Sequence, residues 1–166
     1  MIKFSLLLVL FGVSILLGYQ TAKVYKDKNK FYQDVLDFSK HLKSEISFLK
    51  TDLLSILNKY HYSSVFEKIK NEICDLYKNN QNIEVDKIKD IIKKNIDIDE
   101  AILNNLSQLF FELGRLGYVE ELERLEYYID YFSEISKKKN ERADKMIPFC
   151  KKMSILLGLL VCIVLI

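Results

Sequence analysis

Two histidines and one nearby carboxylate are the residues of this chain whose types and spacing come closest to acid–base chemistry. His41 and His61 are the only histidines, and neither has a second histidine or a cysteine at metal-ligand spacing. His41 lies four residues before Glu45, so the two side chains share a helix face and could exchange a proton. On a solvated face, such a pair is more simply a surface contact. We therefore predict no catalytic site, and we expect the protein not to be an enzyme.

The cysteines, the glycines and the net charge argue against several other classes of protein. Cys74, Cys150 and Cys162 are an odd number at wide spacings, which predicts neither a disulfide framework nor a metal site. The five glycines form no phosphate-binding loop, so no nucleotide or other cofactor is expected. The net charge is only +2, and the lysines gather beside apolar runs. We expect no nucleic acid as a partner.

Both ends of the chain are apolar, and nearly all of the charge lies between them. The first run is Phe4–Tyr19 and the last is Met153–Ile166. As a helix, the last run spans only about 21 Å, against a hydrocarbon core about 30 Å thick, so its length alone leaves its role open. With an apolar run at each end, the layout predicts membrane anchors over residues 1–22 and 148–166 and a cytoplasmic helical domain over residues 23–147.

A cleavable signal peptide is the competing interpretation of the first run. Signal peptides carry positive charge before the apolar run and small residues at the cleavage site after it. Here only Lys3 precedes the run, several lysines follow it, and Gln20 stands two residues ahead of Ala22. This arrangement favours a retained anchor.

Lysines beside the two runs indicate an orientation. Positive residues close to a span tend to remain in the cytoplasm. The membrane-flank lysines are Lys23, Lys26, Lys151 and Lys152, all on the inner side of their run. We expect both termini to point outward, with the lipid bilayer as a partner. The short second run can still span if its lysines extend to the interface or the bilayer thins locally.

The middle of the chain predicts an all-α fold, an antiparallel bundle of about five to six helices. Apolar residues recur every three or four positions from Lys30 to Asn58, which is typical of one long amphipathic helix, joined to the first anchor by a short joint at residues 26–29. Shorter runs with the same spacing follow. Either Gly114 or Gly117 suits the left-handed conformation at a helix end. Pro148 is predicted to bend or restart the last helix.

Small residues four apart occur in both apolar runs, at Ser14 and Gly18 and at Ser154 and Gly158. Residues of this size let helices approach closely. The two spans are therefore candidates to pack on each other or on another membrane subunit.

An acidic patch, formed by Glu120, Glu121 and Glu123, opens the last predicted helix. Acidic side chains at a helix N-terminus most often interact favourably with the helix dipole. The same patch is a candidate binding site for a basic partner, and the sequence leaves both interpretations open.

Four short motifs, in order along the chain, resemble the stage III sporulation protein AB family. They are the first anchor from Gly12 to Tyr19, the LKSEISFLKTDL segment, the Leu-Gly turn before the acidic patch, and the closing apolar segment. The residues that carry the resemblance are Leu42, Glu45, Ile46, Phe48, Thr51, Leu53, Leu116, Gly117 and Gly158. The chain departs from the family's usual glycine, aspartate and glutamine at Leu113, Glu120 and Arg124, so no role at those positions is carried over.

The resemblance implies a subunit of the channel assembled between mother cell and forespore, located in the mother-cell membrane around the forespore. It also implies a likeness to the F-type platform subunits of type II secretion, which are non-enzymatic scaffolds with helical cytoplasmic domains. The implied partners are a cytoplasmic secretion-type ATPase, other channel membrane subunits and, as an open alternative, further copies of the same chain. A stand-alone membrane-tethered binding module or regulator is the competing function.

Overall fold

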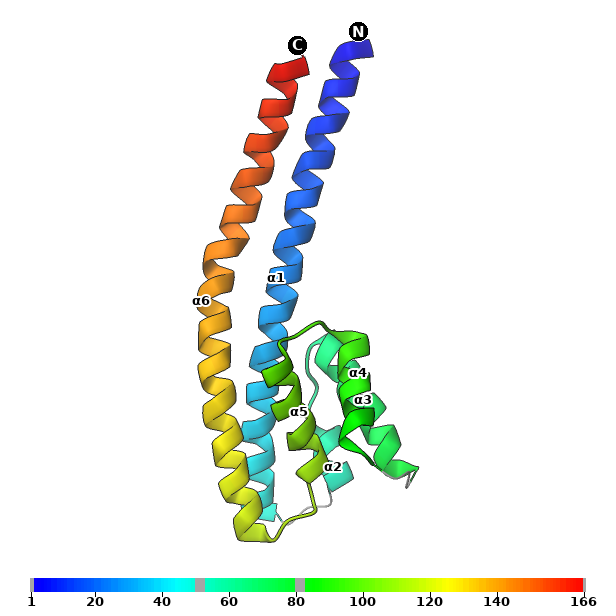
Figure 1. Ribbon diagram of the computed structural model, residues 1–166, viewed down its shortest axis with the longest axis vertical. Coiled ribbons are helices and arrows are strands. Elements are labelled where there is room, and N and C mark those ends of the chain that lie inside the picture. The colour runs from blue at the N-terminus through cyan, green and yellow to red at the C-terminus, as the bar shows by residue number, and fades with distance from the viewer. Residues whose placement is uncertain (1, 50–52, 80–82, 166) are drawn as a thin grey trace. The chain divides into compact units, whose positions relative to one another are not determined.

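The computed structural model describes residues 2–49, 53–79 and 83–165, and all regular structure in these ranges is helical (Figure 1). The helices are α1 (Ile2–Leu49), α2 (Leu53–Lys59), α3 (Ser64–Lys78), α4 (Val85–Asn95), α5 (Glu100–Glu112) and α6 (Tyr118–Leu165). The all-α prediction is confirmed. The chain forms two compact units: Met1–Lys30 with Lys137–Ile166, which we call the helix-pair unit, and Phe31–Ser136, the bundle unit.

One uninterrupted helix, α1, contains both the first apolar run and the start of the bundle. The joint predicted at residues 26–29 is absent, because this polar stretch contains no glycine or proline and its side chains are compatible with a helix. The single helix predicted from Lys30 to Asn58 is described as two helices, since α1 ends at Leu49 and α2 spans Leu53–Lys59. Residues 50–52 lie outside the described residues.

The last helix, α6, continues through Pro148, so the predicted restart of the helix there is wrong. A proline inside a helix removes one backbone hydrogen bond and costs about 3 kcal/mol. Long helical stretches lie on either side of Pro148, and their many hydrogen bonds outweigh this single loss. The predicted boundary at residue 148 is therefore not a break in secondary structure.

Phenylalanine rings form the centre of the bundle unit. Phe31, Phe38, Phe66 and Phe110 are at most 2% exposed and come from α1, α3 and α5. The ring centroid of Phe66 lies 5.3 Å from that of Phe38 and 6.0 Å from that of Phe31, both in edge-to-face geometry. The rings thus hold three helices together. Aliphatic side chains extend this core, including Ile88 and Ile92 of α4 and Leu125 of α6.

Large apolar side chains lie on the outside of the helix-pair unit. Leu8, Leu16, Ile163 and Val164 are between 63% and 75% exposed. In the described part of the chain, two helices are long and apolar enough to cross a membrane, with stretches of mean hydropathy 1.6 within Leu7–Ser47 and 2.0 within Tyr118–Val164. Only 11% of each stretch is buried. The domain boundaries at residues 22 and 148 refer to a bilayer and remain predictions.

Candidate interaction sites

Small residues join α1 to α6 within the helix-pair unit. The Ser14 hydroxyl donates a hydrogen bond to the Ser154 carbonyl oxygen at 3.0 Å. A methyl group added to Gly18 would lie 2.1 Å from Ser154 Oγ, and one added to Gly158 would lie 2.8 Å from a ring carbon of Phe11. Neither distance is compatible with ordinary contact, so the two glycines are required for this approach. The structure thus shows the two apolar runs packed on each other.

Small and polar residues continue this seam along α1 and α6 within the helix-pair unit. Ala22 and Ala143 are each 3% exposed. Asn29 Nδ2 then donates to Asn140 Oδ1 at 2.8 Å. This pair could not be predicted from the sequence, because nothing in the spacing of one helix specifies which residue of the other lies opposite.

Three of the four membrane-flank lysines line one groove between α1 and α6 in the helix-pair unit. The groove has a volume of about 330 Å³ and is lined by Tyr19, Ala22, Lys23, Lys26, Asp27, Ile147 and Lys151. The Lys151 ammonium lies 5.1 Å from the centre of the Tyr19 ring, a cation–π contact. Lys152 is exposed and does not line the groove. Lys151 and Lys152, which the sequence analysis grouped together, therefore have different surroundings in the structure.

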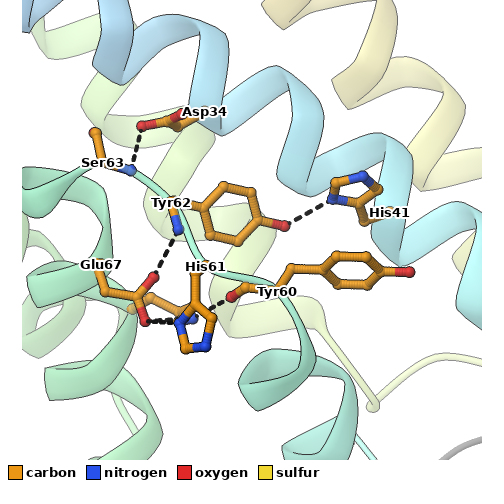
Figure 2. A network of polar contacts seen from close by, with 8 residues as sticks. Asp34, His41, Tyr60, His61, Tyr62, Ser63 and Glu67 are labelled. Atoms are coloured by element: carbon orange, nitrogen blue, oxygen red, sulfur yellow. Dashed lines mark hydrogen bonds and ion pairs between the residues drawn. The ribbon is translucent and has the colours of Figure 1, made fainter.

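A polar network holds the segment from Tyr60 to Ser63 against α1 and α3 in the bundle unit (Figure 2). Tyr62 Oη and His41 Nδ1 are 2.9 Å apart. The Ser63 N–H donates to Asp34 Oδ2 at 2.9 Å, and the Tyr62 N–H donates to Glu67 Oε2 at 3.0 Å. Burial, followed by nearby carboxylates, raises the pKa of Tyr62 well above its usual range, so the hydroxyl stays protonated.

Lys70 is the charged residue at the centre of this network, and it is only 1% exposed. Its ammonium donates to the Tyr60 carbonyl oxygen at 2.7 Å and pairs with Glu67 Oε1 at 2.8 Å. Burial alone would raise the pKa of Glu67, but hydrogen bonds from Lys70 and the Tyr62 N–H lower it on balance. A buried charge with partners of this kind stabilises a local structure, and no vacant position for a ligand follows from it.

Glu45 does not form the predicted surface contact with His41. It is 5% exposed and accepts hydrogen bonds from Lys59 Nζ at 2.6 Å and from Tyr60 Oη at 2.7 Å. These two bonds, Lys59 first, lower the pKa of Glu45. His41 instead stacks on Tyr60, with ring centroids 4.0 Å apart. The prediction failed because Glu45's partners come from the end of α2 and the following residue, which helical spacing within α1 does not reveal.

At the turn between α5 and α6, Gly114 has a φ of 73°, which confirms one of the two glycines expected to adopt the left-handed conformation. The Gly114 N–H donates to Glu121 Oε1 at 2.8 Å, and the Gly117 N–H donates to Glu120 Oε2 at 3.4 Å. Two members of the acidic patch therefore bind the turn itself. Among the described residues, Glu123 makes no hydrogen bond or ion pair. It lines a groove of about 310 Å³ with Leu116, Glu120, Arg124 and Tyr127.

A family comparison covers both units. The family model of stage III sporulation protein AB matches residues 3–166. The chain belongs to the stage III sporulation protein AB family. No curated protein and no solved structure matches the chain. The motif match suggested by the short resemblances thus extends over nearly the whole sequence.

The structure describes the surroundings of most of the residues that carry the stage III sporulation protein AB resemblance. Leu42 is fully buried, and Ile46 packs against the same core. Leu116 is half-buried beside the α5–α6 turn. Thr51 lies outside the described residues, as do the side chains of Phe48 and Leu53.

Positions that depart from the stage III sporulation protein AB pattern also have partners in this chain. Leu113 is 3% exposed, and Arg124 Nη2 lies 3.5 Å from Glu112 Oε1. In this chain, the burial of Leu113 and the ion pair of Arg124 with Glu112 therefore support the turn.

The three cysteines are free thiols. Within the ranges that the structure describes, no group of three or more His, Cys, Asp or Glu residues is placed to hold a metal ion.

Proposed function

We propose that this protein is a two-anchor platform subunit of the channel between mother cell and forespore, acting as a scaffold in the mother-cell membrane around the forespore. Its family supports a role in sporulation. The observation that carries the membrane part of the proposal is the exposed apolar surface of the helix-pair unit, with side chains such as Ile163 at 73% exposure. A bilayer would bury this apolar surface in lipid, whereas in aqueous solution the surface would stay in unfavourable contact with water.

The proposed topology places the bundle in the cytoplasm and both chain ends outside. Membrane-flank lysines on the inner side of each apolar stretch support this orientation. A cysteine replacing exposed Asp90, in a chain whose native cysteines are changed to alanine, should be blocked only by a membrane-permeant maleimide. A reporter fused after Ile166 should be active only on the outer side. Labelling of residue 90 from outside would refute this topology.

We further propose that the groove beside Glu123 contacts the cytoplasmic secretion-type ATPase. Glu123 is exposed and unpaired among the described residues, whereas Glu120 and Glu121 are engaged with the turn. Charge reversal of the whole patch would therefore disturb the fold as well as the surface. Glu123→Lys alone isolates the surface effect.

The test is co-purification of the ATPase with full-length protein from sporulating cells. Glu123→Lys should reduce the recovered ATPase several-fold, since it replaces an attractive charge with a repulsive one. Asp90→Lys is the matched control, because it reverses the same charge at an exposed position of α4. Equal recovery with both variants would remove this groove from consideration.

A platform subunit and a stand-alone regulator predict different complexes. A platform should be recovered after crosslinking in a fixed ratio with other channel membrane subunits, and this ratio should not depend on expression level. A tethered regulator would give a variable ratio and one soluble partner. Turnover of any substrate by the purified chain would contradict the scaffold role.

A further inference from the structure

The groove in the helix-pair unit is built from one face of each helix. Tyr19, Lys23 and Lys26 are four and seven residues apart on α1, which places them on one side of that helix. Ile147 and Lys151 are four apart on α6 and form the opposite wall. The groove has a volume of about 330 Å³ and is open to the outside, since Tyr19, Lys23, Lys26 and Asp27 are exposed.

The charges that line this groove are not neutralised by the protein. Among the described residues, Lys23, Lys26 and Asp27 make no hydrogen bond or ion pair, and Lys151 lies over the Tyr19 ring. Three ammonium groups thus share a cleft with one carboxylate, in a chain whose net charge is only +2. Converging ammonium groups suit an anion with several oxygen acceptors, such as a phosphate.

The groove begins where the apolar stretch ends, so in a bilayer it would overlap the headgroup layer and extend slightly beyond it. It begins beside the apolar stretch at Tyr19 and extends to Lys26, which is a rise of about 10 Å along the helix. One headgroup layer is about 5–8 Å thick, the difference between the whole bilayer and its hydrocarbon core divided between two leaflets. Tyrosine is also the residue type that favours this interface.

We propose that the groove lined by Lys23, Lys26 and Lys151 binds the phosphate of an anionic phospholipid whose acyl chains lie along the exposed apolar surface of the helix-pair unit. This rests on the membrane insertion proposed above. The phosphate of the lipid headgroup would balance the excess positive charge of the three lysines in the groove.

General attraction between lysines and anionic membranes is the competing explanation. It depends on charge and depth and does not depend on the groove. Lys152 distinguishes the two, because it adjoins Lys151 in sequence yet is exposed away from the groove lining. Lys151→Gln and Lys152→Gln remove the same charge at nearly the same depth.

The experiment uses the full chain reconstituted in phosphatidylcholine vesicles with spin-labelled phosphatidylglycerol or spin-labelled phosphatidylcholine. Electron paramagnetic resonance measures the fraction of motionally restricted label and hence the preference for the anionic lipid. Lys151→Gln and Lys23→Gln should each lower this preference about fivefold. Lys152→Gln should change it less than twofold. Reconstitution yield and helix content establish that each variant is folded.

An equal loss with Lys151→Gln and Lys152→Gln would overturn the proposal in favour of general attraction. Displacement of the spin-labelled lipid by millimolar glycerol phosphate would also overturn it, because the ligand would then be a soluble phosphate. Resistance of the chain to carbonate extraction is measured on the same vesicles. Extraction of the chain would refute the membrane insertion itself, whereas integration with no groove effect would refute only the lipid site.

Discussion

The bundle unit buries phenylalanine rings, whereas the helix-pair unit exposes leucine and isoleucine and buries serine and glycine. Phe31 and Phe66 are fully buried in the first, while Leu16 is 63% exposed in the second. In water, removal of large apolar surface drives association. Between helices in lipid that drive is absent, and close approach through small residues replaces it. The two packing rules indicate that the two units are built for different solvents.

Both rules operate along the same helix. In α1 the buried positions include the small residues Gly18 and Ala22 in the helix-pair unit, and the large residues Phe31, Phe38 and Leu42 in the bundle unit. The helix is continuous, and large buried side chains appear only in its bundle part. A change of solvent can therefore be encoded by residue volume without any break in secondary structure.

The largest expected effect is in the bundle core. Phe66→Ala should lower the free energy of unfolding by about 3–5 kcal/mol, because it leaves a cavity among the rings of Phe31, Phe38 and Phe110. Urea unfolding of the full chain in micelles, followed by tyrosine near-ultraviolet circular dichroism, measures this. Val119→Ala, at a position 64% exposed, should change stability by less than about 0.5 kcal/mol. Equal midpoints for the two variants would contradict this description of the core.

The seam of the helix pair gives the next largest effect. Gly18→Ala places a methyl group 2.3 Å from Ser154 Cβ, and this overpacking should cost the helix pair about 1–3 kcal/mol. Gly12→Ala is the matched control, since nothing lies within 4 Å of the added methyl group.

Crosslinking reports on the pair directly. Cys162 Sγ lies 3.8 Å from the Leu7 carbonyl oxygen, so a cysteine replacing Leu7 should be joined to Cys162 by a short bis-maleimide. The yield should fall with Gly18→Ala and stay unchanged with Gly12→Ala, while tyrosine dichroism of the bundle is unaffected. A loss of the tyrosine dichroism of the bundle with Gly18→Ala would contradict the separate packing of the two units.

A smaller, pH-dependent effect is expected at Glu45. Its pKa in the fold is below the ordinary 4.5, so its charge stabilises the fold above that pH, and this contribution is lost as the pH falls through the folded value. Its partner Lys59 has a raised pKa, so the pair persists below pH 10.5. Glu45→Gln should lower the melting temperature at pH 7, and the difference should shrink as the pH falls below 4.5. Unpaired Glu123→Gln should show no such difference, and a gap for Glu45→Gln that stays constant as the pH falls would exclude the carboxylate as its cause.

The smallest effect is expected at Ser14. Ser14→Ala removes one hydrogen bond across the seam and should cost about 0.6 kcal/mol, seen as a modest fall in the same crosslinking yield. Thr21→Ala serves as the comparison, because the Thr21 hydroxyl bonds only to carbonyl oxygens of its own helix, those of Leu17 and Gly18. A fall of equal size in both variants would show that the interhelical bond contributes nothing specific.

Much of the fold followed from periodicity, because positions such as Val35, Phe38 and Leu42 recur on one helix face and are indeed buried. Contacts between helices could not be predicted from periodicity. Spacing within α1 placed Tyr19, Lys23 and Lys26 on one face, but the register of α6 opposite them is set by side-chain fit over a long separation in sequence. The same limit hid Lys59 as the partner of Glu45. The restart of the helix at Pro148 was wrong for another reason, since the general penalty of a proline does not end a helix that continues on both sides.

Gly12 differs from the other glycines of the helix-pair unit, because it faces open space while Gly18 and Gly158 are used within the chain. Pairing inside one molecule occurs at a far higher effective concentration than pairing between molecules. In a membrane, each copy would thus meet its neighbours with its own helices already matched. The unit that enters a bilayer would then be a two-helix element whose close contacts at Gly18 and Gly158 are made within one chain.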